Sequence, residues 1–210
     1  MRIIAGALGG RRLVAPAGRD TRPTSDRVRE AMFSMLEAAL RRVGAGEAGL
    51  EGARVLDLYS GSGALGIEAL SRGADHAVFV EQARPALTAL GGNLRTLGLE
   101  GRATVLASSV ERSLERAASS GPFDLVLVDP PYAQVADGTL GATLAALLER
   151  AVLEAPGLIV LEHASRDEAP SLPVVVAERS RRYGNTTVTV YARPLEDPDD
   201  VEPLDDRADA

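Results

Sequence analysis

The chain has 210 residues, of which 45% are hydrophobic and 25% charged, and its formal net charge is −7, as is typical of one soluble globular domain. It has no cysteine and only two histidines, His76 and His163. The lack of cysteine excludes disulfides, thiolate nucleophiles and cysteine-ligated metals, and no partner spacing supports a site at either histidine. No apolar stretch approaches the roughly 18 residues that span a bilayer, and no signal peptide is recognisable. We therefore expect a cytoplasmic protein without a metal.

The charge is unevenly distributed. Residues 196–210 contain eight acidic residues and one arginine, which gives −7, so residues 1–195 sum to zero. Residues 1–42 hold nine arginines and four acidic residues, a local charge of +5. We expect a basic amino-terminal surface and a disordered acidic tail.

The first 45 residues predict a small extension. Glycine breaks in residues 2–15 favour a short hairpin that carries Arg11 and Arg12. A basic loop with Arg22 follows, and Thr24 or Ser25 can cap a helix that ends near Gly44.

From residue 46 to residue 195 the pattern alternates between strands and helices. Expected strands are 54–59, 77–81, 103–107, 124–128 and 157–162, and expected helices are 64–72, 84–97, 110–119 and 138–153. Two β-branched segments, 174–176 and 186–190, predict a closing antiparallel pair with residues 181–185 between them. The predicted fold is α/β and Rossmann-like, with a mostly parallel seven-stranded sheet covered by helices on both faces.

A glycine loop follows the first of these strands. Gly61, Gly63 and Gly66 fit the pattern G-x-G-x-x-G, and Glu81 closes the next strand 20 residues after Gly61. Such a loop allows a ligand to approach the backbone, and a carboxylate at the second position can accept both hydroxyls of a ribose. A structural turn without a ligand is the alternative, but the strand context and Glu81 favour an adenosine cofactor.

Asp57 bears on which adenosine cofactor this is. It lies four residues before Gly61, where a carboxylate suits the ammonium group of S-adenosylmethionine but would repel the pyrophosphate of NAD. The sequence therefore favours S-adenosylmethionine.

A second motif, Asp129-Pro130-Pro131-Tyr132, follows the apolar run 125–128. This places a carboxylate and an aromatic ring at the carboxyl end of a buried strand, in the crevice where ligands of open α/β sheets bind. The prolines remove two donors and leave the carbonyls of Asp129 and Pro130 free to accept hydrogen bonds from an NH2 group. A planar amine is the expected substrate, and a stiff turn is the structural alternative.

These motifs resemble those of class I methyltransferases that modify exocyclic or amide nitrogens. The segments 22–33, 9–13 and 69–74 are similar to the bacterial 16S ribosomal RNA guanine-N2 methyltransferase family, methyltransferase D of the small subunit. The similarity spans about residues 2–192 and ends with Arg182-Tyr183-Gly184-Asn185-Thr186; the acidic tail lies outside it.

The resemblance implies methyl transfer from S-adenosylmethionine to the N2 amine of one guanine in 16S rRNA, presented by a partly assembled small subunit to a monomeric enzyme. We expect the catalytic residues to be Asp129, Pro130 and Tyr132. The expected cofactor-binding residues are Asp57, Tyr59, Gly61, Ser62, Gly63, Glu81 and Ser109, of which Ser109 replaces the Asp or Asn that usually contacts the adenine in the family. The expected RNA-binding residues are Arg11, Arg12, Arg22, Arg27 and Arg29, unless they pair internally with Asp26 and Glu30.

Three rival functions remain open at this point. An NAD-dependent oxidoreductase shares the glycine loop and Glu81 but leaves Asp57 and the Asp129 motif unexplained. A methyltransferase acting on adenine N6 or on a protein amide would use the same motif, because it suits any planar NH2. The third is an RNA-binding assembly factor without turnover, for which the intact glycine loop has no purpose.

Overall fold

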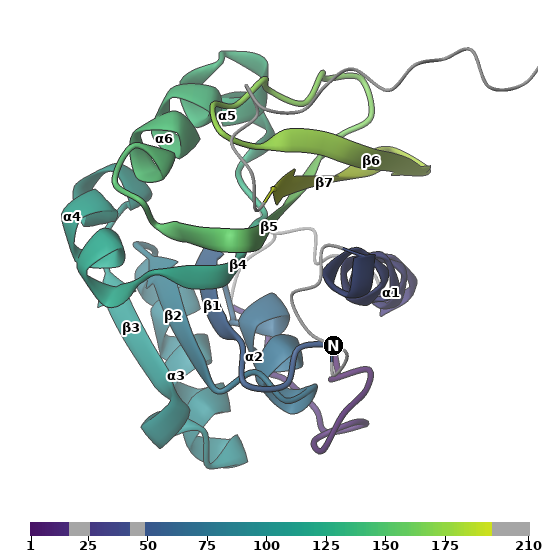
Figure 1. The fold of residues 1–210 in the computed structure, drawn as a ribbon. Helices are drawn as coiled ribbons and strands as arrows, with labels where there is room; N and C mark the ends of the chain where they lie inside the picture. The colour runs from purple at the N-terminus through teal and green to yellow at the C-terminus, as the bar shows by residue number, and fades with distance from the viewer. Residues whose placement is uncertain (17–25, 43–48, 195–210) are drawn as a thin grey trace, which may run out of the picture.

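The computed structural model describes residues 1–16, 26–42 and 49–194. Its centre is a seven-stranded sheet with the order β3-β2-β1-β4-β5-β7-β6, shown in Figure 1. The strands are β1 Arg54–Leu58, β2 His76–Glu81, β3 Ala103–Ala107, β4 Phe123–Val128, β5 Leu153–Ala164, β6 Val176–Tyr183 and β7 Thr186–Arg193. Strands β1 to β5 are parallel to one another, whereas β7 pairs antiparallel with both β5 and β6. The expected fold class is confirmed.

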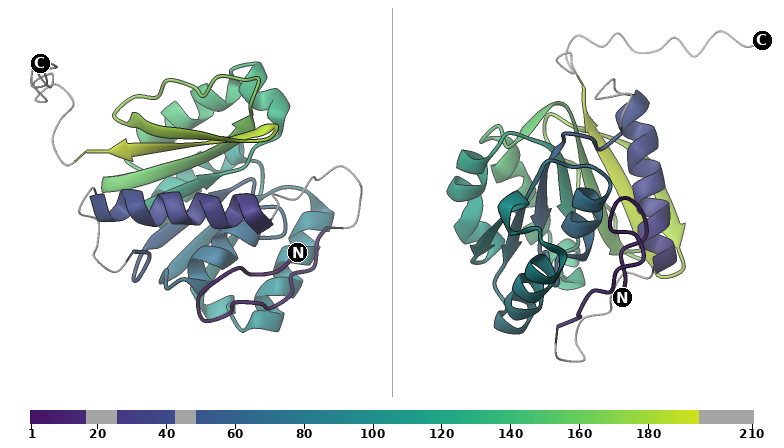
Figure 2. Two further views of the ribbon diagram at one scale, coloured as in Figure 1. Left: turned by 90° about the vertical axis from the view of Figure 1, so that its right-hand side faces the viewer. Right: turned by 90° about the horizontal axis from the view of Figure 1, so that it is seen from below.

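Helices cover both faces of the sheet. They are α1 Asp26–Arg42, α2 Ala64–Ser71, α3 Arg84–Leu97, α4 Val110–Ser120, α5 Tyr132–Ala136 and α6 Thr139–Leu148, with a short 3-10 turn, η1, at Glu100–Arg102. One apolar core joins α1, α2 and α3 to one face, and a second joins α4 and α6 to the other. Figure 2 shows α1 lying across the sheet beside β5 and β7. The central parallel strands β1, β2 and β4 are buried because helices cover both faces of the sheet, which explains their continuous apolar runs. Strand β3, at the edge, is mostly exposed.

Four elements differ from the sequence prediction. Helix α5 was not predicted, and α6 ends at Leu148, so that β5 begins at Leu153 and not near residue 157. Strand β6 occupies Val176–Tyr183, which includes most of the segment predicted to be a turn: Arg182 pairs with Thr187 and Tyr183 with Thr186. Because β6 lies at the edge of the sheet and is exposed along its length, it does not need the alternating apolar residues by which strands are recognised.

The amino-terminal segment forms the predicted hairpin only loosely. Arg2 and Arg12 make an isolated antiparallel bridge, and the Ile3 amide donates to the Arg11 carbonyl at 2.9 Å. Residues 1–16 contain no regular strand. The predicted caps Thr24 and Ser25, the helix end near Gly44, the boundary between residues 45 and 46 and the acidic tail lie outside the described residues.

Glu68 anchors this segment to α2. Its side chain is fully buried and accepts hydrogen bonds from the amides of Ile4 at 2.7 Å and Ala5 at 2.9 Å and from Arg72 Nε at 2.8 Å. Arg72 also pairs with Glu37 of α1 at 2.8 Å. A buried charge is tolerated only when it is paired and hydrogen-bonded, and this network joins the segment, α1 and α2.

Candidate cofactor and substrate site

The predicted site residues converge at the carboxyl edge of the parallel strands. Leu58, the last residue of β1, lies opposite Val80 of β2 on one side and Val128 of β4 on the other. The residues that follow these three positions, Tyr59, Glu81 and Asp129, therefore emerge at one level. The chain leaves β1 toward α2 on one face and β4 toward α5 and α6 on the other, which makes this edge the topological switch point where α/β proteins bind ligands.

The glycine loop is shaped by backbone hydrogen bonds. The Ser60 amide donates to the Val80 carbonyl at 3.1 Å and the Gly63 amide to the Ser60 carbonyl at 2.7 Å. Gly61 has a φ of 56° and a Cβ added there would meet open space. At Gly63, with a φ of 82°, a Cβ would lie 2.5 Å from Leu90 Cδ1. Gly61 thus leaves room for a ligand, whereas Gly63 is required by packing as well as by its φ angle.

Glu81 holds the loop from the neighbouring strand. One carboxylate oxygen accepts from the Gly61 amide at 2.9 Å, and the other accepts from the amides of Gln82 and Ala83 at 2.7 Å each. A carboxylate offers about four acceptor positions, so about one remains here. Binding both ribose hydroxyls would require Glu81 to share or release one backbone amide.

Asp57 lies beneath the loop and is 1% exposed. Its Oδ2 accepts from the Gly66 amide at 2.9 Å. Burial raises the pKa of this carboxyl to about 7, against the lowering effect of the Gly66 hydrogen bond, and the charge of Glu81 adds to the rise. A buried carboxylate of this kind is stabilised by a cation, so Asp57 fits the ammonium group of the predicted cofactor.

Tyr59, Ser62 and Ser109 are the remaining predicted cofactor-binding residues. Tyr59 has a φ of 57°, is half-buried, and its hydroxyl has no partner among the described residues; burial is the largest cause of its raised pKa. Ser62 is buried and its carbonyl accepts from Asn93 Nδ2 at 3.0 Å. Ser109 caps α4, with its hydroxyl 3.4 Å from the Arg112 amide, two residues beyond the end of β3. That hydroxyl keeps a second lone pair with which to accept from an adenine amine.

The Asp129 motif passes directly from β4 into α5. Asp129 is half-buried, Pro130 is buried and Pro131 precedes the first helical residue, Tyr132. Proline suits this position because its missing N–H is not needed at a helix start. Tyr132 is 37% exposed, and its hydroxyl lies 3.4 Å from Thr186 Oγ1 at the start of β7.

Sequence reasoning missed two residues of this region. Asn93 of α3 is buried and bonds to Ser62 of the loop and, through both its amide atoms, to the backbone of Val14. Thr186 contacts Tyr132 across 54 positions of sequence. Nothing in the local pattern marks either residue, because each acquires its partner only through the tertiary structure.

Comparison with known proteins supports the assignment of the chain to the methyltransferases. The sequence model of the family "Conserved hypothetical protein 95" matches residues 1–192. Ribosomal RNA small subunit methyltransferase D of Escherichia coli (strain K12) is 34% identical over 203 residues, 96% of this chain and 94% of that protein. YlbH of Bacillus subtilis (strain 168), described as a candidate rRNA methyltransferase, is 40% identical over 195 residues, 92% of this chain and 99% of that protein. The solved structure of a candidate methyltransferase of Escherichia coli, yhhF, has a TM-score of 0.75 at 35% identity, covering 93% of this chain and 99% of that one.

The chain belongs to the conserved hypothetical protein 95 family. As a member of this family it has the class I methyltransferase fold that the sequence predicted, with the glycine loop after β1 and the Asp129 motif after β4 in adjacent positions.

One of the predicted RNA-binding arginines of this family member is not on the surface. Arg29 is only 1% exposed, and its Nη2 donates to the Arg2 carbonyl at 2.6 Å and to Asp26 Oδ1 at 2.8 Å. The prediction of RNA contact does not fit Arg29, and the internal pairing with Asp26 is what the structure shows. Arg11, Arg12 and Arg27 are exposed, and Arg22 lies outside the described residues.

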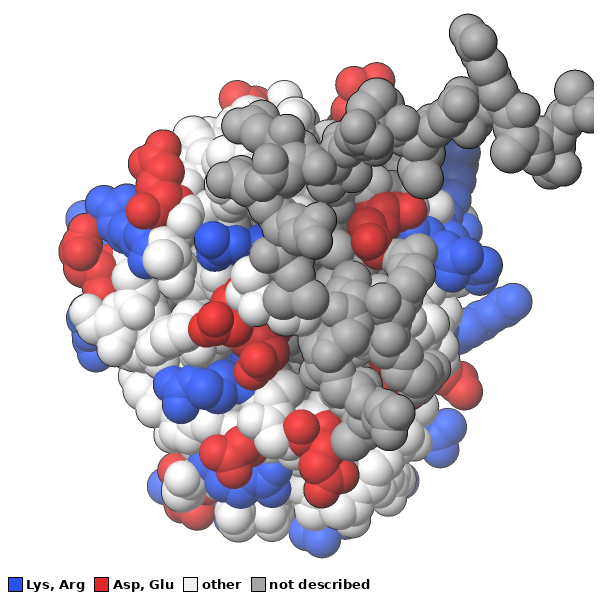
Figure 3. Space-filling model, viewed as in Figure 1, with Lys and Arg blue, Asp and Glu red and all other residues white. Residues whose placement is uncertain are grey.

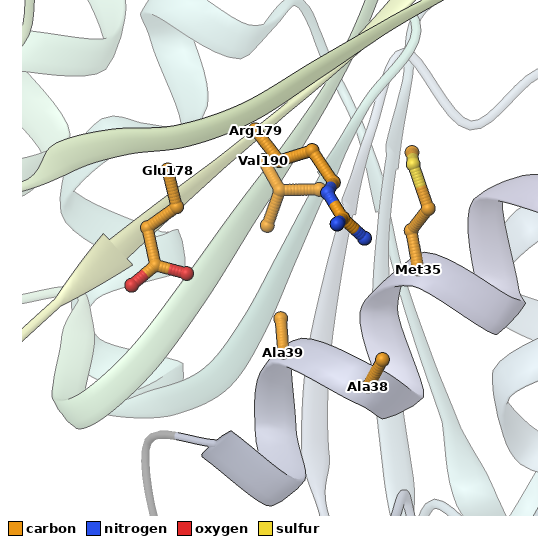
Figure 4. Close-up of a pocket in the computed structure, with 6 residues that line it drawn as sticks. All are labelled: Met35, Ala38, Ala39, Glu178, Arg179 and Val190. Carbon is orange, nitrogen blue, oxygen red and sulfur yellow. The ribbon is translucent and has the colours of Figure 1, made fainter. Parts of the chain in front are cut away.

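Two cavities lie away from the switch point. One, of about 230 Å³, is lined by residues of α1, β6 and β7, as Figure 4 shows. Another, of about 330 Å³, lies at the amino edge around His76 and Thr104, whose side chains are 2.9 Å apart. Neither contains a predicted site residue. Among the described residues, no group of three His, Asp or Glu side chains could hold a metal ion, and no helix is long and apolar enough to cross a membrane.

Proposed function

We propose that the protein transfers a methyl group from S-adenosylmethionine to the exocyclic N2 amine of one guanine in the 16S rRNA of the small ribosomal subunit. The observation that carries the proposal is the register of β1 and β4, in which Leu58 faces Val128. It brings the glycine loop and the Asp129 motif to adjacent strand ends. The names of the methyltransferase D relative and of YlbH support rRNA as the substrate.

Three polar parts of the cofactor have a matching side chain among the described residues. Asp57 would pair with the ammonium, Glu81 with the ribose hydroxyls and Ser109 with the adenine amine, while Gly61 and Gly63 let the loop backbone approach. Tyr59 and Ser62 would line the same loop. When bound, S-adenosylmethionine supplies an electrophilic methyl group on a sulfonium.

The amine must be activated by the Asp129 motif. The N2 lone pair of guanine is delocalised into the ring, so the nitrogen attacks only when it pyramidalises. The Asp129 carboxylate and the Pro130 carbonyl would each accept a hydrogen bond from one N–H of the amine. This directs the lone pair toward the methyl group and stabilises the positive charge that develops as the N–C bond forms. The surplus proton leaves through Asp129 to solvent. Prior deprotonation of the amine is unnecessary.

Tyr132 would stack on the guanine, which has to leave any helical stack to reach the site. Its hydroxyl is directed toward Thr186 of β7, which fixes the ring at the first position of α5. Substrate and cofactor residues thus meet from opposite faces of the sheet.

The test is Asp129→Ala, assayed with labelled S-adenosylmethionine and unmethylated small subunits. We expect methyl transfer to fall on the order of 10²-fold or more, the usual effect of losing a preorganised polar group, while binding of S-adenosylhomocysteine stays within a few-fold of wild type. Asp75→Ala, at an exposed carboxylate near the amino edge, is the matched control. Unchanged turnover in Asp129→Ala would overturn the mechanism, and label on an adenine or on protein would overturn the substrate.

A further inference from the structure

Strand β6 carries an arginine-rich strip at the free edge of the sheet. The strand contains Arg179, Arg181 and Arg182 against one acidic residue, Glu178, which gives a net charge of +2. Residues 176–182 are exposed, and among the described residues no salt bridge involves any of the three arginines. Figure 3 shows basic side chains along the right-hand rim of the molecule, the side on which Figure 1 shows β6 and α1.

The strip leads to the candidate substrate site. Thr186, the first residue of β7, pairs with Ala164 at the carboxyl end of β5 and with Tyr183 of β6. The tip of the β6–β7 hairpin therefore lies at the same edge of the sheet as the Asp129 motif. The contact of Tyr132 with Thr186 joins the hairpin to that motif directly. The left view of Figure 2 also places the hairpin tip and the first turn of α1 at the same end of the molecule.

The pairing with β7 determines which way the arginines point. Arg179 and Arg181 lie opposite Val190 and Val188, which belong to the core on the α1 side, and two residues of a strand span roughly 7 Å. Figure 4 shows the Arg179 side chain extending over α1 near Met35. Arg182 lies opposite Thr187, with its Nε bonded to the Gly184 carbonyl at 2.8 Å. The strip thus presents charge on both sides of the hairpin.

We propose that Arg179, Arg181 and Arg182 bind phosphates of the substrate RNA and, together with the amino-terminal arginines, hold it across the Asp129 motif. The inference rests on the proposed function, since it assigns that RNA a second contact surface. Arginine suits this role because its planar fork binds phosphate oxygens in pairs. Charge on an edge strand also discourages pairing with other strands, but that purpose does not require the charge to lie beside the substrate site.

The test compares a double variant, Arg181→Ala with Arg182→Ala, with a control, Arg112→Ala with Arg116→Ala. The control residues are exposed on α4, which Figure 1 shows on the side of the molecule away from β6. Binding to unmethylated small subunits and to a 16S rRNA transcript is measured against salt concentration. We expect the double variant to bind about tenfold more weakly and its salt slope to fall by about 1 for each phosphate that it no longer binds.

Further readouts separate an RNA contact from a structural defect. S-adenosylhomocysteine affinity and kcat at saturating subunits should match wild type while KM rises, and Arg181→Lys with Arg182→Lys should restore most of the salt slope. A double variant whose slope and KM equal those of the α4 control would overturn the proposal. If the wild type binds rRNA without methylating it, the proposed function fails while the slopes still decide the role of the strip. If the wild type binds no rRNA, both proposals fail.

Discussion

Asp57 combines deep burial with a position where a cation is expected. Its carboxyl loses the solvation that would keep it ionised, and one amide hydrogen bond from Gly66 compensates only in part, so its pKa stands at about 7. In an unfolded chain the pKa of the same group is about 3.9. Its contribution to stability is therefore fully present below about pH 4 and is lost as the pH rises to about 7. A bound ammonium group would stabilise the ionised form that the fold alone disfavours.

This titration predicts how cofactor affinity depends on pH. Because the ammonium group pairs with the ionised carboxylate, binding of S-adenosylhomocysteine should weaken about tenfold for each pH unit below about 7 and level off above it. Calorimetry from pH 5.5 to pH 8.5 measures this directly. Asp57→Asn should bind weakly at every pH and lose the dependence. A wild-type affinity that is flat across this range would show that Asp57 does not pair with the cofactor.

At the scale of elements, the glycines of α2 and α3 have different purposes. A Cβ on Gly66 would overlap the Phe79 ring and lie 2.9 Å from Asp57 Oδ2, so α2 can approach β1 and β2 only with glycine there. Gly92 lies within α3, and a Cβ added to it would meet nothing within 4 Å. One glycine is required by packing, whereas the other only lowers helix propensity.

Alanine substitutions should therefore have opposite effects at the two positions. Gly66→Ala is expected to lower the free energy of unfolding by about 1–3 kcal/mol through overpacking, whereas Gly92→Ala should raise it by about 0.5–1 kcal/mol. Urea denaturation of both variants provides the comparison. Equal effects of the two substitutions would contradict the close contact between α2 and β2.

The elements that could be predicted from the sequence are those whose burial is visible as a pattern in their own residues. Strands β1, β2 and β4 are covered on both faces and so have apolar runs, and the spacing of Asp57, Gly61, Glu81 and Asp129 follows from their places in or just after these strands. Helix α5 was missed because five residues are too few to show the 3.6-residue period of an α-helix. The extent of β6 was missed because it is an exposed edge strand. The burial of Arg29 depends on the carbonyl of Arg2, 27 positions away, and no local pattern reports such a partner.

At the scale of the whole molecule, buried charges attach the amino-terminal segment to the methyltransferase fold. Glu68 accepts the Ile4 and Ala5 amides and pairs with Arg72, and the Arg72 guanidinium also lies 4.8 Å from the centre of the Phe33 ring of α1. Asn93 bonds to Val14 on one side and to the glycine loop on the other. The segment that carries Arg11 and Arg12 is thus attached to the two helices beside the candidate cofactor site, so proposed RNA-binding and cofactor groups share one support.

Breaking this attachment should release the segment without unfolding the sheet. In Glu68→Gln, the amide nitrogen would replace one acceptor oxygen, leave a buried backbone N–H unpaired and remove the charge that Arg72 needs, at a cost of about 3–5 kcal/mol. Hydrogen exchange at Ile4 and Ala5 should become fast, while exchange in β1 and β4 stays slow. Glu115→Gln breaks a pair with Arg150 in which Glu115 is 80% exposed, and it should cost less than about 1 kcal/mol. If the Ile4 and Ala5 amides stayed protected in Glu68→Gln, Glu68 would not be the residue that holds the segment in place. The apolar contacts of the buried Ile3 and Leu13 would then have to hold it.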